Sequence, residues 1–439
     1  MGGADPVGAA LPDALPPDAL PSDALPSDAL PSDAVATSAL ARCIAIPAER
    51  FAAEYWSARP LLTPAAESGA DYSDLLDVAA IDELLSRRGL RTPFLRIAKQ
   101  GKVIPAREFT RSGGVGAGVT DQVADDKVLG LVADGATLVL QALHRTWPPL
   151  VRFGSTLSTE LGHPVQINCY LTPPQNQGFA PHYDTHDVFV LQIAGHKRWV
   201  VHQPVLTDPL PGQDWEQRRA AVTTRAAEPP LLDLMLQPGD ALYLPRGFIH
   251  SATAQGETSI HLTVGVHPVT RHSLLKHLLA EAATDPKLRA SLPLGGDLAA
   301  EARLADQLRE TVHAFAAFAE EGRLPQVAGR LADELAGSTR PEPIEPMAQL
   351  AALAALTPSA SFRLRAGLRA RLERRPDAVL VKAIDTSLSL PLSAEAALKL
   401  VLSGEPVSAA ALPGLDAEAA LTLVRTLLTA AILVPERGA

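Results

Sequence analysis

The most restrictive feature of this sequence is a run of short, strand-like segments between residues 136 and 267, separated by turns that contain glycine or proline. Val188–Ile193 and Arg198–His202 are rich in β-branched and aromatic residues, and they flank the polar turn Gly195–Lys197 as the arms of a hairpin would. Similar segments are Ala136–Gln141, Val165–Leu171, Asp240–Leu244 and Ser259–His267. Many short strands with few helices between them predict a mainly β core, an antiparallel barrel or double-sheet sandwich of the jelly-roll kind.

The chain is long enough for more than one domain, because 439 residues exceed what a single hydrophobic core usually organises. Residues 1–37 repeat a five-residue unit, seen as PSDAL at Pro21–Leu25, and this proline-rich composition predicts a disordered tail. Two short helices are expected next, at Phe51–Leu62 and Ile81–Arg88. The barrel domain would then occupy residues 38–270.

A helical block is predicted at residues 271–340, after the last strand. Apolar residues recur there at helical spacing, as Leu304, Leu308 and Val312 do on one face. An amphipathic block of this kind suggests a surface for dimerisation, although packing within one chain would produce the same pattern.

The remaining residues, 341–439, are expected to form a separate small domain. Ser393 and Asp416 are each placed to cap a short helix, and two short helices joined by a turn resemble a helix-turn-helix or winged-helix unit. The second of these predicted helices carries Arg425 as its one basic residue, so direct DNA binding is not expected.

Composition narrows the function classes further. The formal net charge of −10 argues against a general nucleic-acid-binding surface, because phosphate neutralisation needs clustered Lys and Arg. Cys43 and Cys169 lie far apart and form no CxxC pair, which argues against a disulfide framework or a thiolate zinc site. Ala417–Val434 is interrupted by charges and falls short of a membrane span, so we expect a soluble cytoplasmic protein.

The residues with the clearest chemical meaning are His182 and Asp184. They are two positions apart, so on a strand both side chains would point to one face. His250 is the best candidate for a third ligand, because it follows a strand and a Pro-Arg-Gly turn that could aim its imidazole inward. Two histidines and one carboxylate make the facial triad of non-haem iron oxygenases, which leaves three coordination positions open.

Three other histidines compete for the same role. His186 is four residues from His182 and would share its face if the strand continued. His196 and His202 fall in or beyond the expected hairpin turn, and we interpret them as solvated or structural.

Lys197 is the candidate partner for a dicarboxylate cosubstrate. It begins the return strand of the expected hairpin, and its ammonium group could pair with a carboxylate that lies remote from the metal. Spacing alone favours the simpler interpretation, a solvated lysine in a hairpin turn.

Four stretches of this sequence resemble a known family, in the same order and at suitable separations. They are YWSARPLL (Tyr55–Leu62), NCYLTPPQNQGFAPHYDTHDVFVLQIAGHKRW (Asn168–Trp199), PGDALYLPRGFIHSA (Pro238–Ala252) and HLTVGV (His261–Val266). The region from about Ser38 to His267 resembles the JmjC-type cupin family that includes the ribosomal oxygenases. Members of this family are iron(II)- and 2-oxoglutarate-dependent hydroxylases of histidyl or arginyl side chains in ribosomal proteins.

The resemblance implies a set of roles for the residues that match the family's motifs. The metal ligands would be His182, Asp184 and His250, with iron(II) as the metal and 2-oxoglutarate and O₂ as cosubstrates. Residues that bind 2-oxoglutarate would be Lys197, Asn168 and His261. Tyr170 would line the substrate pocket.

The family layout also implies partners. Residues 271–340 would be a dimerisation block, residues 341–439 an acidic winged-helix domain, and the protein a homodimer. A ribosomal protein would be the substrate, modified on a histidine or an arginine. The acidic net charge fits basic partners of this kind through long-range attraction.

Two other functions remain open from the sequence. One is a 2-oxoglutarate oxygenase that acts on a small metabolite or a peptide natural product. The other is a non-catalytic interaction module that retains the metal site as a structural element. Lys197 and the intact histidine and aspartate set argue against the second.

Overall fold

A computed structural model describes residues 38–99, 101–174, 176, 179–295, 300–384 and 386–436. The expectation of a disordered tail at residues 1–37 lies outside the described residues. Within the described ranges, no helix is both long and apolar enough to span a membrane.

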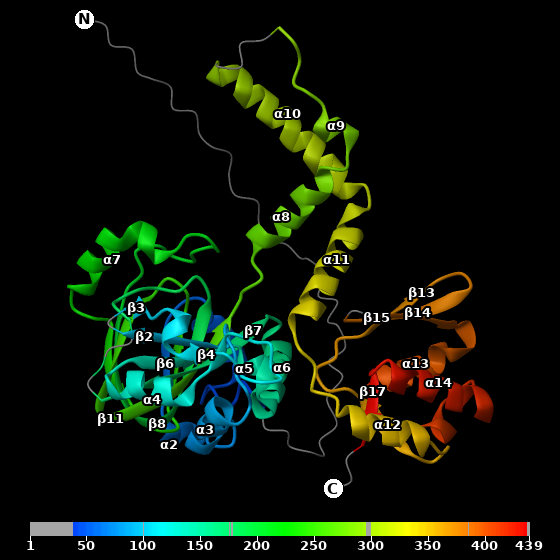
Figure 1. Ribbon diagram of the computed structural model, residues 1–439. Coiled ribbons are helices and arrows are strands. Elements are labelled where there is room, and N and C mark those ends of the chain that lie inside the picture. Colours follow the sequence, from blue (N-terminus) through cyan, green and yellow to red (C-terminus); the bar gives the residue numbers. More distant parts are fainter. Residues whose placement is uncertain are drawn as a thin grey trace, which may run out of the picture. The chain divides into compact units, whose positions relative to one another are not determined.

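The centre of the fold is a nine-stranded sheet in the order β1-β10-β8-β11-β7-β6-β2-β3, with β9 paired to β8 (Figure 1). Each recorded strand pair in it is antiparallel, which confirms the predicted β class. The strands are β1 (Leu61–Thr63), β2 (Leu95–Lys99), β3 (Lys102–Val103), β6 (Thr137–Leu140), β7 (Val165–Thr172), β8 (Asp187–His202), β9 (Leu232–Leu236), β10 (Ala241–Leu244) and β11 (Ile249–Val266). A small pair, β4 (Thr110–Arg111) and β5 (Gln122–Val123), lies apart.

The predicted hairpin turn at Gly195–Lys197 is wrong. Residues 187–202 form one 16-residue strand, β8, which pairs with the 18-residue β11 on both sides of the supposed turn. Gly195 does take the left-handed conformation of a turn residue, at φ 64°. The ladder to β11 shifts register opposite it, so this glycine bends the strand instead of ending it.

The long strand β8 is covered on both faces. Val188 and Val190 belong to one hydrophobic cluster, whereas Phe189 and Leu191 belong to another. Successive side chains of a strand point to opposite faces, so a continuous apolar run is expected where both faces are buried. Two-sided burial of this kind places the polar residues of the sheet in a dry interior.

Among the described residues, six α-helices precede β8, and a seventh lies between β8 and β9. They are α1 (Ala48–Glu54), α2 (Ala65–Ser68), α3 (Val78–Ser86), α4 (Asp125–Ala133), α5 (Leu143–Thr146), α6 (Pro148–Leu161) and α7 (Arg219–Ala226). The second predicted helix corresponds to α3. The first prediction was too long, because α1 ends at Glu54 and Leu61 already pairs with Tyr243 of β10. Ser57 has a positive φ of 52°, which is incompatible with continued helix.

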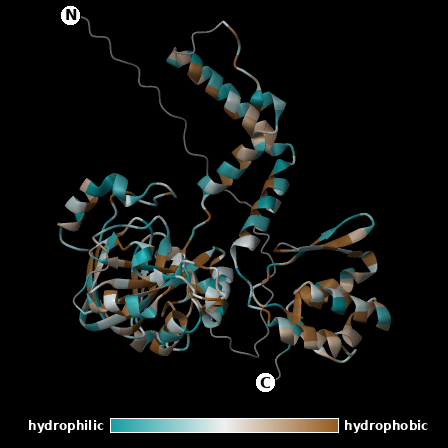
Figure 2. Cartoon of the chain, in the orientation of Figure 1, coloured by the Kyte–Doolittle hydropathy of each residue, from teal (hydrophilic) through white to brown (hydrophobic). Residues whose placement is uncertain are grey.

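Four helices follow the sheet, and a small mixed domain follows them. The helices are α8 (Arg271–Ala282), α9 (Pro286–Arg289), α10 (Glu301–Glu320) and α11 (Arg323–Ser338). Both α10 and α11 carry hydrophobic and hydrophilic residues along their length (Figure 2). The mixed domain contains α12 (Pro346–Ala354), β12 (Ser361–Leu364), β13 (Arg371–Arg374), β14 (Ala378–Ala383), β15 (Thr386–Pro391), α13 (Glu395–Leu402), β16 (Val407–Ser408), α14 (Ala417–Thr429) and β17 (Leu433–Pro435).

The two predicted helix caps of this small domain have different outcomes. Asp416 accepts a hydrogen bond from the backbone N–H of Ala419 and starts α14. Ser393 does not cap α13, because it lies within a 3₁₀ turn that precedes Glu395. The winged-helix assignment of this domain remains a prediction.

Candidate metal centre

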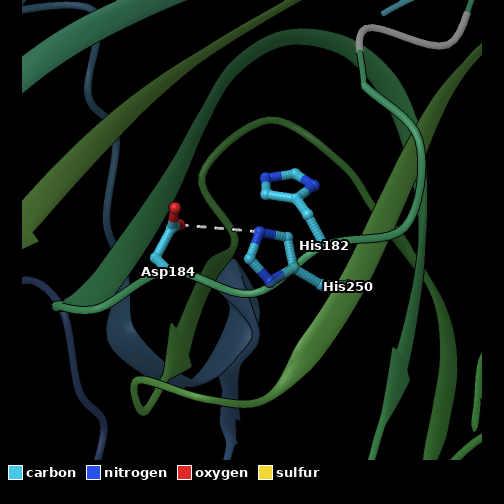
Figure 3. Close-up of side chains that lie close together, drawn as sticks. All are labelled: His182, Asp184 and His250. Carbon is cyan, nitrogen blue, oxygen red and sulfur yellow. Dashed lines mark ion pairs between the residues drawn. The ribbon is translucent and has the colours of Figure 1, made fainter. Parts of the chain in front are cut away.

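The three predicted ligands come together at the point where β11 begins (Figure 3). His182 lies in the segment before β8, not within a strand, and it forms an isolated antiparallel bridge with His250. Its backbone N–H donates to the His250 carbonyl at 3.2 Å, and the His250 N–H donates back at 2.8 Å. The two histidines are therefore brought together by backbone pairing between distant parts of the chain.

One potential ligand atom from each of His182, Asp184 and His250 lies within 4.8 Å of the others. His250 Nε2 is 3.7 Å from Asp184 Oδ2, and the two imidazole ring centres are 4.5 Å apart. Side chains two residues apart on an extended segment share a face, which explains why His182 and Asp184 converge although no strand includes them.

Both imidazoles are oriented by hydrogen bonds to backbone carbonyls. His182 Nδ1 is 2.8 Å from the Ala180 carbonyl oxygen, and His250 Nδ1 is 3.1 Å from that of Phe248. A carbonyl can only accept, so each Nδ1 carries the proton and each Nε2 keeps a free lone pair. This outer hydrogen bond is typical of metal-ligating histidines. Two Nε2 atoms and one carboxylate fit a divalent first-row metal such as iron(II).

The charge states of the group also suit a cation. Burial opposes ionisation of Asp184, but nearby imidazoles, led by that of His186, hold the pKa of its carboxyl below the usual value. Burial and the proximity of His182 lower the pKa of His250 to about 4. The site therefore offers an ionised carboxylate and a neutral imidazole at neutral pH, which are the forms that bind metal.

Lys197 lies inside the sheet and not in a solvated turn. It is only 3% exposed, and its Nζ donates to Thr172 Oγ1 of β7 at 3.0 Å. Burial lowers the pKa of its ammonium group to about 7. The interpretation favoured by spacing alone was wrong, because the turn on which it depended does not exist. A buried lysine of this kind would be stabilised by a bound carboxylate.

His261 and Tyr170 stack against each other, with ring centres 5.1 Å apart and an interplanar angle of 10°. His261 Nδ1 is buried and has no hydrogen-bond partner among the described residues. Burial, with the charge of Lys197, holds the pKa of His261 well below its usual value. An unpartnered buried nitrogen at this position is consistent with the predicted contact to a cosubstrate.

Asn168 has a partner of its own. Its Oδ1 accepts from the N–H of Ala142, a residue at φ 56° that precedes α5. Its side-chain oxygen thus supports that turn, and the amide nitrogen is the group that could donate to 2-oxoglutarate.

The three competing histidines are not members of the candidate ligand group and have other contacts. His186 stacks on His267, with ring centres 5.1 Å apart. His196 is solvated and its Nδ1 lies 2.8 Å from Glu257 Oε1. His202 is buried at the end of β8.

Sequence reasoning missed three residues that surround the predicted site. Thr172 follows Tyr170 by two positions in β7, so strand periodicity could have found it. Trp199 lies 5.9 Å from His250 and 5.6 Å from His261 between ring centres. Arg96 comes from β2 and reaches the site across the sheet, and no local sequence signal indicates this.

This chain is similar in sequence to several known proteins. Residues 146–274 match the family described as the JmjC domain. The bifunctional lysine-specific demethylase and histidyl-hydroxylase NO66 of Aedes aegypti is 31% identical over 264 residues, which cover 56% of this chain and 38% of that protein. Ribosomal oxygenase 1 of Gallus gallus is 34% identical over 229 residues, covering 51% and 36% respectively. The chain thus spans less than two-fifths of the length of these relatives.

The solved structure of the ribosomal oxygenase YcfD from Escherichia coli is similar over most of its length. It aligns with a TM-score of 0.52 at 18% sequence identity, and the alignment covers 89% of this chain and 98% of that one. At this identity the likeness shows a shared fold. Another structure of the E. coli protein contains cobalt and 2-oxoglutarate.

Proposed function

Since this chain contains a JmjC domain, we propose that it is an iron(II)- and 2-oxoglutarate-dependent oxygenase that hydroxylates a protein side chain. One observation carries the proposal. Two imidazole Nε2 atoms and a carboxylate converge at the start of β11, and the neighbouring strand β8 carries a buried lysine whose ammonium group donates to the Thr172 hydroxyl. Iron and 2-oxoglutarate together would supply the oxidising chemistry when bound, and the chain would supply ligands and orientation.

The side chains around the triad have separate tasks in this proposal. His182, Asp184 and His250 would hold the metal. Lys197, anchored by Thr172, pairs with the remote carboxylate of 2-oxoglutarate. The buried aromatic and aliphatic residues of β8 and β10 exclude water around them.

Lys197 would not work alone in holding the cosubstrate. His261 would donate or accept through its free Nδ1, and Asn168 would donate through its amide nitrogen. Tyr170, which is partly accessible, would face the substrate.

The proposed target is a histidine or an arginine of a ribosomal protein. The names of the relatives support the histidine and the ribosomal protein, since they include a histidyl-hydroxylase and two ribosomal oxygenases. A histidine fits the charges of the site better, because Arg96 and Lys197 are cationic and would repel a guanidinium but not a neutral imidazole.

The test is an intact-mass comparison of ribosomal proteins from cells with and without this chain, paired with an in vitro assay. Purified protein, iron(II) and 2-oxoglutarate should form succinate and add the mass of one oxygen atom to one ribosomal protein. If 2-oxoglutarate is consumed and every ribosomal protein keeps its mass, the substrate is a different molecule. Failure to consume 2-oxoglutarate with any partner fraction would refute the oxygenase assignment.

We also propose that the protein is a homodimer and is cytoplasmic, where it would meet its substrate. Leu279 of α8 is 64% exposed, and Leu308 and Val312 of α10 are 64% and 63% exposed. They help to line a cavity of about 500 Å³ between α8, α9 and α10. Large apolar side chains gathered at one solvent-facing cavity are typical of a contact surface.

A further inference from the structure

A row of side chains crosses four neighbouring strands beside the metal centre. Arg96 of β2 lies opposite Val139 of β6, and Val139 lies opposite Tyr170 of β7. Tyr170 in turn lies opposite His261 of β11. Residues directly opposite each other in antiparallel strands point to the same face of the sheet. Arg96 and Tyr170 therefore share the face that carries His261, with a valine between them.

Arg96 is long enough to reach over this valine to the phenol. Burial raises the pKa of the Tyr170 phenol to about 12, and the guanidinium of Arg96 opposes that rise through its charge and a side-chain hydrogen bond. The guanidinium carbon also lies 5.5 Å from the centre of the Phe179 ring. Phe179 is 5.9 Å from His182 and 6.4 Å from Tyr170 between ring centres. The positive charge is therefore held next to the side chains that surround the candidate metal.

The direction of the hydrogen bond between Arg96 and Tyr170 follows from the chemistry of arginine. A guanidinium carries only donors and stays protonated, so the Tyr170 oxygen must accept. The phenol hydrogen is then free to be donated to a third group. Since the Tyr170 ring is stacked on His261 and partly accessible, that third group can be an incoming side chain.

We propose that Arg96 is a positioning residue for the target side chain and acts through Tyr170, an inference that rests on the proposed hydroxylase function. Arg96 orients the phenol as a hydrogen-bond donor, and the donor meets an acceptor atom on the target. A neutral imidazole has such an atom in its unprotonated nitrogen, whereas a guanidinium has none. The pair thus selects targets with an acceptor nitrogen and fixes the ring orientation in front of the metal.

A spectroscopic experiment tests the contact without any activity. The chain has five tyrosines, so incorporation of 3-fluorotyrosine gives few ¹⁹F signals, and Tyr170→Phe identifies the one from Tyr170. Arg96→Met should shift that signal, and Arg96→Lys should shift it less. Arg107→Met is the matched control, because Arg107 is 80% exposed and lies outside the site. An unchanged Tyr170 signal in Arg96→Met would overturn the proposal, whatever the enzyme does.

A kinetic experiment tests the role, with acid-extracted ribosomal protein as the substrate. Arg96→Met should raise the KM for ribosomal protein by roughly tenfold, the loss expected for a hydrogen bond with a charged donor, and Arg96→Lys should restore part of it. In the Tyr170→Phe background, Arg96→Met should raise the KM for ribosomal protein little further, because the two residues act as one unit. The affinity for 2-oxoglutarate should stay within about twofold of wild type in Arg96→Met.

The outcomes separate this inference from the proposed function. Loss of 2-oxoglutarate affinity in Arg96→Met with an unchanged KM for ribosomal protein would overturn the inference, because Arg96 would then hold the cosubstrate. Additive effects of the Arg96 and Tyr170 substitutions would overturn it as well. If wild-type protein modifies no ribosomal protein, the proposed target fails, and the ¹⁹F signal still decides whether Arg96 orients Tyr170.

Discussion

His182 and His250 are oriented alike, each through a hydrogen bond from Nδ1 to the carbonyl two residues earlier. If the proposed ligand atoms are both Nε2 atoms and the Asp184 carboxylate, replacing His182 or Asp184 by alanine would remove a direct metal contact. Succinate formation should fall by more than about a hundredfold. Mutation of a residue that only hydrogen-bonds to a metal ligand already lowers metal affinity or activity by about 10–100-fold. His196→Ala is the matched control, because that ring is solvated and paired with Glu257. Undiminished succinate formation in the His182 variant would refute the triad.

Lys197 gives the site a dependence on pH. Its pKa is lowered to about 7 by burial, so in the free protein it is charged below that pH and loses its proton above it. A bound carboxylate stabilises the charged form, and binding above pH 7 must therefore take up a proton. The Kd for 2-oxoglutarate should rise by up to about tenfold per pH unit above 7. Calorimetric titration in buffers of different ionisation enthalpy measures both the affinity and the proton uptake.

Two substitutions at Lys197 separate charge from position. Lys197→Met should abolish measurable binding of 2-oxoglutarate, because the carboxylate would be buried without a partner. Lys197→Arg keeps the charge at every accessible pH, so the binding that remains should lose its dependence on pH above 7. Identical binding curves for wild type and Lys197→Met would show that the cosubstrate binds elsewhere.

At the scale of elements, the bend of β8 depends on Gly195. Its φ is 64°, and an added Cβ would lie 2.3 Å from the carbonyl oxygen of Thr258 in β11. Gly195→Ala should therefore lower the melting temperature more than Gly256→Ala, which has φ 72° but open space around it. Gly256→Ala should lower the free energy of unfolding by about 1–2 kcal/mol, because alanine is strained in the left-handed backbone conformation. Equal melting temperatures for the two variants would show that β11 shifts to accommodate the added Cβ without a loss of stability.

At the scale of the whole molecule, the exposed apolar face of α8 and α10 leads us to predict how the oligomeric state responds to mutation. Leu308→Asp together with Val312→Asp should convert a homodimer to a monomer, because charges in an apolar contact are left unpaired. Light scattering after size-exclusion chromatography measures the mass. Leu129→Asp is the control, since Leu129 is 70% exposed on α4, outside that face. A wild-type protein of monomer mass would contradict the dimer.

Local patterns in the sequence predicted the central strands of the large sheet, several helices and part of the site. The strand-like segments, the α3 helix and the Asp416 cap follow from side-chain periodicity and capping, which act over a few residues. The convergence of His182 and Asp184 follows from their spacing on extended backbone. His250 was the best candidate for a third ligand because it follows a strand and a Pro-Arg-Gly turn, and the resemblance to a known family supported this choice and indicated the role of Lys197.

Tertiary structure alone decided three features. A glycine in a turn conformation can end a strand or bend it, and the pairing of β8 with β11 on both sides of Gly195 makes it a bend. That continuity buries Lys197, which spacing alone placed in solvent. Arg96 reaches Tyr170 because β2, β6 and β7 are neighbours in the sheet. Strand periodicity shows which face a side chain takes, but the side chains it meets there depend on strand order and register, and these arise only when the whole sheet assembles.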